Sequence, residues 1–562
     1  MAADNFYNSI SLKNKEYVIG TGTAIASIRQ IRNQFYDAAY RQEVCRKGFY
    51  EAQYEAISEV EDLFGEVNGV QFQGAIEDLW SSMQELAKFP DSLTTRSTVV
   101  NAASDFLTRA KDIYNQLCDY QVDLNNKIKN SVNEINDLGN KIYDLNKKIM
   151  NIETAGIENA NDLRDQRNQY LDQLSELIEI EYYEEPNGVV NVIAEGSNFI
   201  TNIGVNEMSL SKDDDGFVTP YWKAYKENVF ADNEFSSITI KSDYGYLKGL
   251  MMARGNKQAS VMDMPVEPKE SDYNSLAEYN NALNAYLTAT DEYNKTIDTS
   301  SIMTVMAQFD TLISGIAKTI DDVLSPNTEM DILVDDGTGN LIGQKITILD
   351  EKNAPVGMDE DATVGETLFS RIGVDRYETI KVTTYKRDEN GVILKDAAGN
   401  LLTEEKYVKK YIEEDPTNKA TMYTITELEI NDEVIHNYSK LPLSTLENNN
   451  EYGYNSVVVD LVDVWDKEFA KIAPGTMTDY NFQDYYKAMV EDMGNVGYTM
   501  KIMMEGQQTM VDSANDTREN YMGVSTDEEL SNLMKAQNAY NASSRYFNVI
   551  NSMLETLILG LG

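Results

Sequence analysis

Histidine and cysteine are nearly absent from this chain of 562 residues, which contains one histidine, His436, and two cysteines. A histidine-based proton relay, a metal site with several histidines and a zinc knuckle cannot be assembled from this stock. An enzyme would depend on carboxylates, lysines or serines alone, and no spacing in the sequence selects a pair of them. We therefore predict no catalytic, cofactor-binding or metal-binding residues, and no cofactor.

The two cysteines, Cys45 and Cys118, could form at most one disulfide, and their distance in the sequence leaves that pairing open. Both fall in segments with helical periodicity. A free cysteine in such a segment packs like a small apolar residue. We expect two unpaired, packed thiols.

Basic side chains are also scarce, with 48 Lys and Arg against 93 Asp and Glu, which gives a formal net charge of −45. Binding to nucleic acid or to anionic membranes depends on Lys and Arg, so neither is an expected partner. No apolar run approaches the ~20 residues that span a bilayer, and the first residues lack the basic-then-apolar pattern of a cleaved secretory signal. The chain therefore either stays in the cytoplasm or leaves by a route that reads no such signal.

Helical periodicity is abundant, from about Ile25 to Ile180. Apolar or small residues recur at steps of three and four, which predicts a long helix whose stripe needs a partner helix. About 50 residues at 1.5 Å each form a rod of about 75 Å. Polar residues between the stripe positions, such as Asn125, Asn126 and Lys129, are predicted to face solvent. The stripe consists of Ala103, Phe106, Ala110, Ile113, Leu117, Tyr120 and Leu124, then Ile128, Ser131, Ile135, Leu138, Ile142, Leu145, Ile149 and Ile152.

Strand-like alternation with tight turns appears in two segments, from about Glu181 to Gly245 and from about Pro326 to Asp460. The second segment contains the turn signals Asp336-Gly337 and Asn390-Gly391. The acidic cluster Asp213–Gly216 favours a turn over a calcium site, because its spacing does not fit an EF-hand loop. Between the two segments, helical spacing returns with a tyrosine row that we interpret as a packing stripe: Tyr273, Tyr279, Tyr286 and Tyr293.

Helix is predicted again from about Lys467 to the end of the chain. Thr526 is the predicted cap of the last helix, with Glu529 reaching back to the backbone. A stripe with alternating steps of three and four follows, and an apolar stripe of this kind must be buried against something. Its residues, which we expect to pack against other subunits, are Leu530, Leu533, Gln537, Tyr540, Phe547, Leu554, Leu557 and Leu561.

Four stretches match a known sequence pattern. The run from Arg518 to Leu530, RENYMGVSTDEEL, resembles the C-terminal motif of bacterial flagellar axial proteins, and its GVSTDEE part resembles the family of the first hook-associated protein. The stretch NDLRDQR, from Asn161 to Arg167 with Leu171-Asp172 and Leu174-Ser175 following, resembles a further segment of that family. So does the stretch IRNQFYD, from Ile31 to Asp37 with Tyr40-Arg41 following. A glycine-containing stretch, Gly245 to Leu250, resembles its turn into a helix.

The patterns and the resemblance together predict an α+β fold, elongated and multi-domain, with a long helical bundle or coiled-coil rod of N- and C-terminal segments and an inserted β-rich outer domain. The family begins with a long amphipathic helix that residues 1–19 lack, so the chain looks truncated at its start. We expect a residual N-terminal connector (1–24); a helical rod domain (25–325) with a small β-hairpin region (181–245) and a helical insert (263–299); a β-rich outer domain (326–465); a return helical segment (466–525); and a C-terminal amphipathic helix for axial packing (526–562).

The resemblance implies a structural subunit, not an enzyme, that joins the flagellar hook to the filament. It implies as partners copies of the chain itself, the hook protein, and the next hook-associated protein or flagellin, with an export chaperone on the C-terminal helix. The location would be the extracellular flagellum, after export by the flagellar secretion apparatus without a cleaved signal. The alternatives are a flagellin, the third hook-associated protein, a non-flagellar coiled-coil adhesin or fibre, and, last, an enzyme.

Overall fold

The structure, a computed structural model, describes residues 2–12, 15–27, 32–64, 72–154, 159–230, 244–273, 275–335, 341–388, 392–396, 401–446, 452–453, 455–523 and 526–561. The chain forms two compact units. One unit comprises Met1–Lys47, Asp137–Val205 and Glu505–Gly562, and the other comprises Gly48–Asn136 and Asn206–Met504. Both units mix helices with β-sheets, so the expected α+β fold is confirmed.

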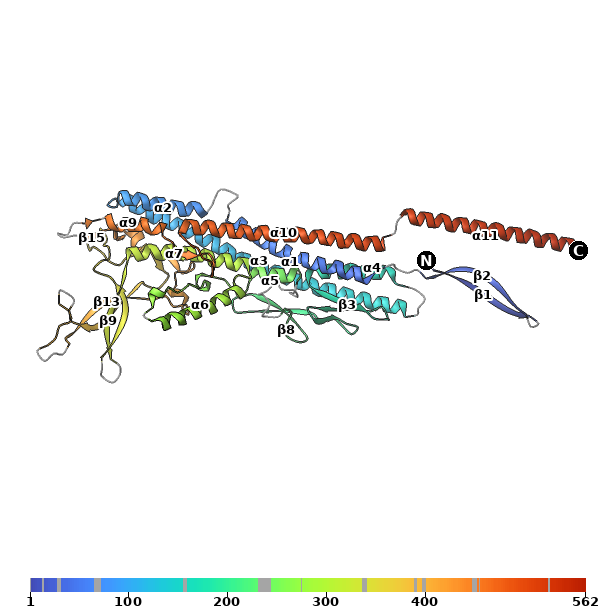
Figure 1. Ribbon diagram of the computed structural model, residues 1–562, viewed down its shortest axis with the longest axis horizontal. Coiled ribbons are helices and arrows are strands. Elements are labelled where there is room, and N and C mark those ends of the chain that lie inside the picture. The colour runs from blue at the N-terminus through green and yellow to red at the C-terminus, as the bar shows by residue number, and fades with distance from the viewer. Residues whose placement is uncertain are drawn as a thin grey trace. The chain divides into compact units, whose positions relative to one another are not determined.

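Four helices occupy the first part of the chain after residue 33 (Figure 1). They are α1 (Gln34–Phe64), α2 (Phe72–Lys88), α3 (Leu93–Glu153) and α4 (Asn161–Leu177). Helix α3 confirms the predicted long helix, and most stripe residues are buried in it, for example Phe106 and Ile135. Ile113 and Tyr120 are only partly buried, and Ile152 is exposed.

The polar residues between the stripe positions of α3 do not all face solvent. Asn126 and Lys129 are exposed as predicted, but the prediction is wrong for Asn125. Its side-chain Oδ1 accepts the backbone N–H of Val218 at 3.1 Å, and its Nδ2 donates to the carbonyl of Gly216 at 3.3 Å. An amide side chain both donates and accepts, so it can satisfy two backbone groups at once.

Two further asparagines of α3 bind backbone in the same manner. Asn136 donates to and accepts from Met208, at 2.9 and 2.8 Å, and Asn146 does the same with Val190, at 2.8 and 3.1 Å. The three asparagines are spaced by 11 and 10 residues, about three helical turns, so they lie along one face of α3. They attach short strands to the helix.

These strands form two three-stranded antiparallel sheets, β3-β4-β5 and β6-β7-β8. Gly139 of α3 permits close packing here, because a Cβ atom at this position would lie 2.5 Å from the ring of Phe199. The acidic cluster forms the predicted turn, in which Asp213 accepts the backbone N–H groups of Gly216 and Phe217. The strands are β3 (Ile180–Glu184), β4 (Val190–Ala194), β5 (Ser197–Ile200), β6 (Met208–Lys212), β7 (Val218–Trp222) and β8 (Glu227–Asn228).

Three helices follow: α5 (Tyr246–Arg254), α6 (Leu276–Thr296) and α7 (Ser301–Leu324). Helix α7 is almost entirely buried, and Phe309 on it packs against rings from α1 and α2, Phe64 and Phe72, at centroid distances of 5.3 and 5.0 Å. In the tyrosine row, Tyr286 and Tyr293 are buried as expected for packing, whereas Tyr273 is exposed. The 3₁₀ turns before α6 are Val261–Asp263 and Glu270–Asp272.

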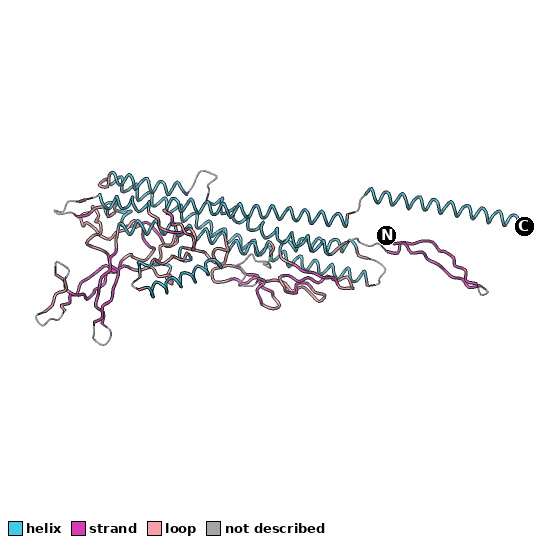
Figure 2. The backbone as a smooth tube through the Cα atoms, in the orientation of Figure 1, coloured by secondary structure: helices cyan, strands magenta, loops and turns pink. Residues whose placement is uncertain are grey.

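The second β region forms a closed four-stranded barrel in the order β10-β13-β12-β9 (magenta in Figure 2), built from two antiparallel hairpins. Ile332, Val382 and Val408 form its core. The predicted turns at 336–337 and 390–391 lie outside the described residues. The strands are β9 (Asn327–Asp335), β10 (Leu341–Leu349), β12 (Tyr377–Tyr385) and β13 (Thr403–Tyr411), and a separate pair consists of β11 (Phe369–Arg371) and β14 (Leu428–Ile430).

Two buried carboxylates on α7 hold loops and the β11-β14 pair. Asp310 accepts the backbone N–H groups of Val261 and Ile425, both at 2.7 Å, and Asp321 accepts those of Leu368 and Phe369. Burial raises the pKa of Asp310 to about 7 and that of Asp321 to about 8, although these backbone donors and, for Asp321, a nearby arginine act against the shift.

The remaining chain contains short elements and two long helices. The helix predicted from about Lys467 begins later, at Phe482, because β17 and β18 pair across the turn at Pro474-Gly475 and the ring of Phe469 packs on that of Phe482 at 4.5 Å. The elements are α8 (Asp432–His436), β15 (Thr445–Leu446), β16 (Tyr452–Gly453), α9 (Asn455–Asp463), β17 (Ala470–Lys471), β18 (Asp479–Tyr480), α10 (Phe482–Met522) and α11 (Thr526–Leu561), with 3₁₀ turns at Lys419–Thr421, Tyr438–Lys440 and Val464–Asp466.

In the segment 1–24, for which the sequence suggests a connector, the described residues belong to two paired antiparallel strands. The strands are β1 (Ala2–Leu12) and β2 (Lys15–Ser27), with register shifts between Ala2 and Ala3 and between Asn5 and Tyr7. The helical periodicity expected from about Ile25 therefore begins later, with α1 at Gln34.

Candidate assembly site

Helix α11 combines an apolar stripe with complete exposure. Every described residue from Thr526 to Leu561 is exposed, including all eight predicted stripe residues. Tyr540 is 75% exposed and Leu561 is 81% exposed. The structure therefore places the predicted residues on one helix and brings none of them into a packed core, and their role in packing stays a prediction.

The predicted cap of α11 is not tested by the structure. The helix begins at Thr526, with acidic residues including Glu529 in its first turn. The residue before it, Ser525, lies outside the described residues. Acidic side chains at this end are favourable, because a helix N-terminus carries partial positive charge.

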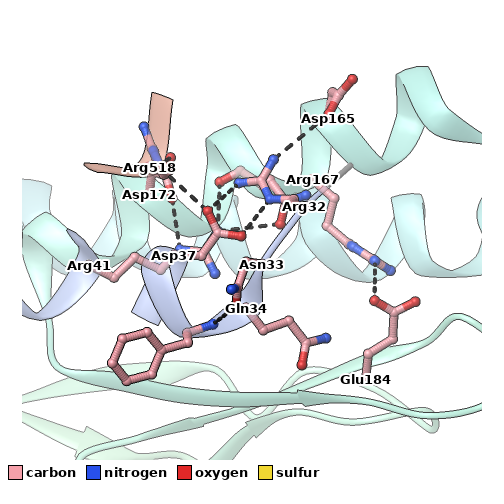
Figure 3. Close-up of polar contacts among 12 residues, drawn as sticks. Arg32, Asn33, Gln34, Asp37, Arg41, Asp165, Arg167, Asp172, Glu184 and Arg518 are labelled. Atoms are coloured by element: carbon pink, nitrogen blue, oxygen red, sulfur yellow. Dashed lines mark hydrogen bonds and ion pairs between the residues drawn. The ribbon is translucent and has the colours of Figure 1, made fainter. Parts of the chain in front are cut away.

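Directly before α11, the end of α10 is attached to α1 and α4 by a group of charged side chains (Figure 3). Asp172 of α4 accepts Arg41 Nε at 2.7 Å and Arg518 Nη1 at 2.8 Å, so a single carboxylate joins α1 and α10. Asp37 accepts both Arg32 Nε and Nη2, at 2.5 and 3.0 Å. We call these five residues, Arg32, Asp37, Arg41, Asp172 and Arg518, the arginine clamp.

The arginine clamp is held by aromatic rings as well as by charge. The guanidinium of Arg518 lies 3.8 Å from the ring centroid of Tyr40, and that of Arg41 lies 4.5 Å from the ring of Tyr182. Cation–π contacts of this kind are worth more when the groups are desolvated. Burial, together with the nearby Asp172 carboxylate, raises the pKa of the Tyr40 hydroxyl.

A second charged group lies on α4. Arg167, which is 1% exposed, donates to the side chain of Asn146 at 2.9 Å and to the carbonyl of Gly188 at 2.6 Å. Burial lowers its pKa to about 10 despite the nearby Glu184 carboxylate. Arg164 donates to Glu153 at 2.7 and 2.8 Å, and this hydrogen bonding lowers the pKa of Glu153.

The stretches that match the known pattern supply these residues. Arg32 and Asp37 come from the stretch that begins at Ile31, Arg164 and Arg167 come from the stretch that begins at Asn161, and Arg518 opens the C-terminal stretch. The sequence revealed the stretches by resemblance, but it did not reveal that they meet. The resemblance included Asp172, but nothing in the sequence indicated that two arginines share it, because its partners are 131 and 346 residues away.

The two cysteines are unpaired thiols with raised pKa values. Both cysteines are free, as predicted, and Cys45 is buried. Burial raises the pKa of Cys118 to about 11 and that of Cys45 well above its usual range, so both thiols stay protonated near neutral pH. In the described part of the chain, no group of three or more His, Cys, Asp or Glu residues is arranged to hold a metal ion. No described helix combines the length and apolar character needed to cross a membrane.

Comparison with known proteins identifies the class. Residues 57–331 match the model of the flagellar hook-associated protein FlgK helical domain. Residues 518–560, which begin at Arg518 and include nearly all of α11, match the flagellar basal body rod FlgEFG protein C-terminal model. The chain is therefore a flagellar structural protein.

The relatives narrow this class. Flagellar hook-associated protein 1 of Bacillus subtilis is 22% identical, and the match covers 100% of this chain and 91% of the Bacillus protein. The Salmonella typhimurium protein of the same name is also 22% identical, and that match covers 96% of this chain and 90% of the Salmonella protein. A solved structure of the flagellar hook junction protein FlgK from Burkholderia pseudomallei covers 87% of this chain and 100% of that chain, with 12% identity and a TM-score of 0.46. On the family-model match and the two relatives, the chain belongs to the family of flagellar hook-associated protein 1.

Family membership confirms the expected class of function, a structural subunit of the flagellum at the junction of hook and filament, over flagellin, the third hook-associated protein and an adhesin. It also means that the chain works as part of the extracellular flagellum, in association with other flagellar components.

Proposed function

We propose that this chain joins hook to filament by packing the apolar stripe of α11 against neighbouring flagellar subunits. The observation that carries the proposal is the exposure of the whole stripe on a 36-residue helix. Burying one large apolar side chain is worth roughly 1.5–3 kcal/mol. A stripe of this length therefore supplies enough free energy for stable association once a partner covers it.

The arginine clamp supports this role. Arg518 is held by Asp172 and by the ring of Tyr40, so α10 is fixed four residues before its last residue, Met522. Load on α11 would pass through this point into α1 and α4. The partners are further copies of the chain, the hook protein below, and the next hook-associated protein or flagellin above.

Export precedes assembly in this proposal. The chain leaves the cell through the flagellar secretion apparatus without a cleaved signal, and an export chaperone covers the α11 stripe until then. Exposed apolar rows promote association with unintended partners, which is the reason for such a cover. The chain has no catalytic role, and its net charge of −45 keeps the extracellular polymer soluble.

The test uses the native gene in a flagellated host. Replacing Leu533 and Leu554 by aspartate should leave the chain folded, because both side chains are exposed. Hooks should form, but filaments should not attach, and flagellin should accumulate in the medium. A matched variant, Asn538→Asp with Ser552→Asp, adds the same charge to exposed positions off the stripe and should swim normally. Normal motility of the Leu533→Asp, Leu554→Asp variant would contradict the proposal.

A further inference from the structure

A cavity of about 500 Å³ lies in the β-rich part of the chain, between residues of the β11-β14 pair and residues of β12 and β13. Ligand sites in proteins have volumes of about 300–1,000 Å³, so this cavity is large enough for a small organic molecule. It involves neither the α11 stripe nor the arginine clamp. Its lining includes five charged residues from these strands and the turn before β12: Arg371, Asp375, Arg376, Lys409 and Glu429.

Two arginines line the buried part of this cavity. Arg371 is 3% exposed, and its Nη1 donates to two backbone carbonyls at 2.6 and 3.0 Å. The Arg376 side chain is also mostly buried, and it donates to the Asp322 carboxylate at 2.6 Å and to the Tyr423 hydroxyl at 2.7 Å. Both guanidinium groups are thus held by the chain itself, and they make the buried part of the lining cationic.

Lys409 supplies donors that the chain does not fully use. Its partly buried ammonium donates to the carbonyl of Val364 at 2.9 Å, which is its one hydrogen bond to the residues that the structure describes. An ammonium group carries three N–H donors. Two of them therefore remain for a molecule in the cavity.

Three carboxylates on the exposed part of the lining supply unused acceptors: Asp375, Glu429 and Asp432. Within the described part of the chain, none of these three carboxylates accepts a hydrogen bond or forms an ion pair. Glu366 of the same lining differs from them, because it accepts the side-chain amide of Asn431 at 2.9 Å. The cavity thus combines free donors on its buried side with free acceptors on its exposed side.

This distribution of charge identifies the class of ligand. The exposed carboxylates repel an anion, and the arginines and Lys409 repel a cation that enters the buried part. A neutral ligand rich in hydroxyls avoids both costs, because each hydroxyl can donate to a carboxylate and accept from an ammonium. Tyr377 and Tyr423 line the same cavity, and the negative face of an aromatic ring attracts the C–H groups on one face of a sugar.

We propose that this cavity binds a short neutral oligosaccharide. In this site Lys409 donates to hydroxyls of the sugar, while Glu429 and Asp432 accept from others. A zwitterion such as an amino acid also carries both kinds of group, but it is too small to fill the cavity. The inference goes beyond the proposed function, because it assigns a ligand to a site that takes no part in the packing of α11.

Titration calorimetry with the purified full chain tests the class of ligand. The neutral probes are maltotriose, cellotriose, lactose and N,N′-diacetylchitobiose, and we expect saturable binding of at least one. The anion sialyllactose, the cation spermidine and the zwitterion glycylglycine should each bind at least tenfold more weakly than that probe. The proposal would be overturned if no neutral probe bound, or if a charged probe bound more tightly.

Substitutions locate the binding in this cavity. Lys409→Met keeps most of the side-chain length but removes the ammonium, and it should weaken binding of the neutral probe at least tenfold. Glu429→Ala should weaken it several-fold and leave the fold intact, because Glu429 is exposed. Lys406→Met, at an exposed position of β13 outside the cavity lining, is the matched control and should bind normally. Unchanged binding in both cavity variants would refute the site.

Motility separates this site from the proposed function. Cells with Lys409→Met or Glu429→Ala should swim normally, because α11 is unaltered, whereas the Leu533→Asp, Leu554→Asp variant should bind the neutral probe as the unsubstituted chain does. Competition against the bound probe then identifies the source of the carbohydrate. One arm adds polysaccharide purified from the surface of the bacterium's own cells, and the other adds soluble starch or mucin. Displacement in either arm supports the proposal and names the source, and displacement in neither arm would contradict it.

Discussion

Helices α3 and α11 both carry apolar residues at alternating steps of three and four, and their surroundings are opposite. In α3, Phe106, Ile135 and Ile142 are fully buried by other parts of the same chain. In α11 every described residue is exposed. The apolar spacing thus predicts that a helix needs a partner. It does not predict whether that partner belongs to the same chain.

The largest expected effect is a difference in stability between a substitution in the α3 stripe and one in the α11 stripe. Ile135→Asp places a charge in a site with no exposure and should lower the free energy of unfolding by at least ~4 kcal/mol. Leu533→Asp at the equivalent kind of position in α11 should change it by less than ~0.5 kcal/mol. Thermal unfolding of the two purified variants measures the contrast. Equal destabilisation would mean that α11 already has a partner within its own chain.

A smaller effect is expected from the polar residues between the stripe positions. Asn146→Ala removes the partner of the Val190 backbone groups and of Arg167, which should cost about 2–3 kcal/mol because buried polar groups are left unpaired. Asn541→Ala, at an exposed position of α11, should be neutral within ~0.5 kcal/mol. Urea denaturation compares the two variants, and a neutral Asn146→Ala would refute the structural role of the α3 asparagines.

The smallest expected effect concerns Arg518, near the end of α10, the helix that precedes the exposed helix α11. In Arg518→Lys, an ammonium cannot bind Asp172 and Asn515 together while stacking on Tyr40, which should cost about 1 kcal/mol. The loss should be local, so amide hydrogens near residues 513–522 should exchange several-fold faster. Lys501→Arg, at an exposed position of the same helix, serves as the control and should leave exchange unchanged.

Local periodicity explains which parts of the fold were predictable. The α3 stripe and α11 follow from spacing within a few residues, and the Asp213 turn follows from local chemistry. The asparagine contacts were not predictable, because Asn125 and Asn146 bind backbone groups 93 and 44 residues away. The late start of α10 had a signal, Pro474-Gly475, but the packing of Phe469 that stabilises the short strands is a tertiary contact.

The candidate site was predictable in parts. Spacing located the α11 stripe, and resemblance located the stretches that contain the arginine clamp. Neither revealed that Arg41 and Arg518 share Asp172, since a charged residue on a helix surface usually marks a solvated face.

The asparagines of α3 also protect a sheet edge from pairing with other copies of this chain. A strand at the border of a sheet presents unpaired N–H and C=O groups, to which a strand of another molecule can add. Strand β6 borders its sheet, and Asn136 occupies both backbone groups of Met208. A side chain from a helix thus takes the place that a foreign strand would fill. In a polymer that holds its subunits at very high local concentration, this arrangement directs association toward helices and away from open-ended β aggregation.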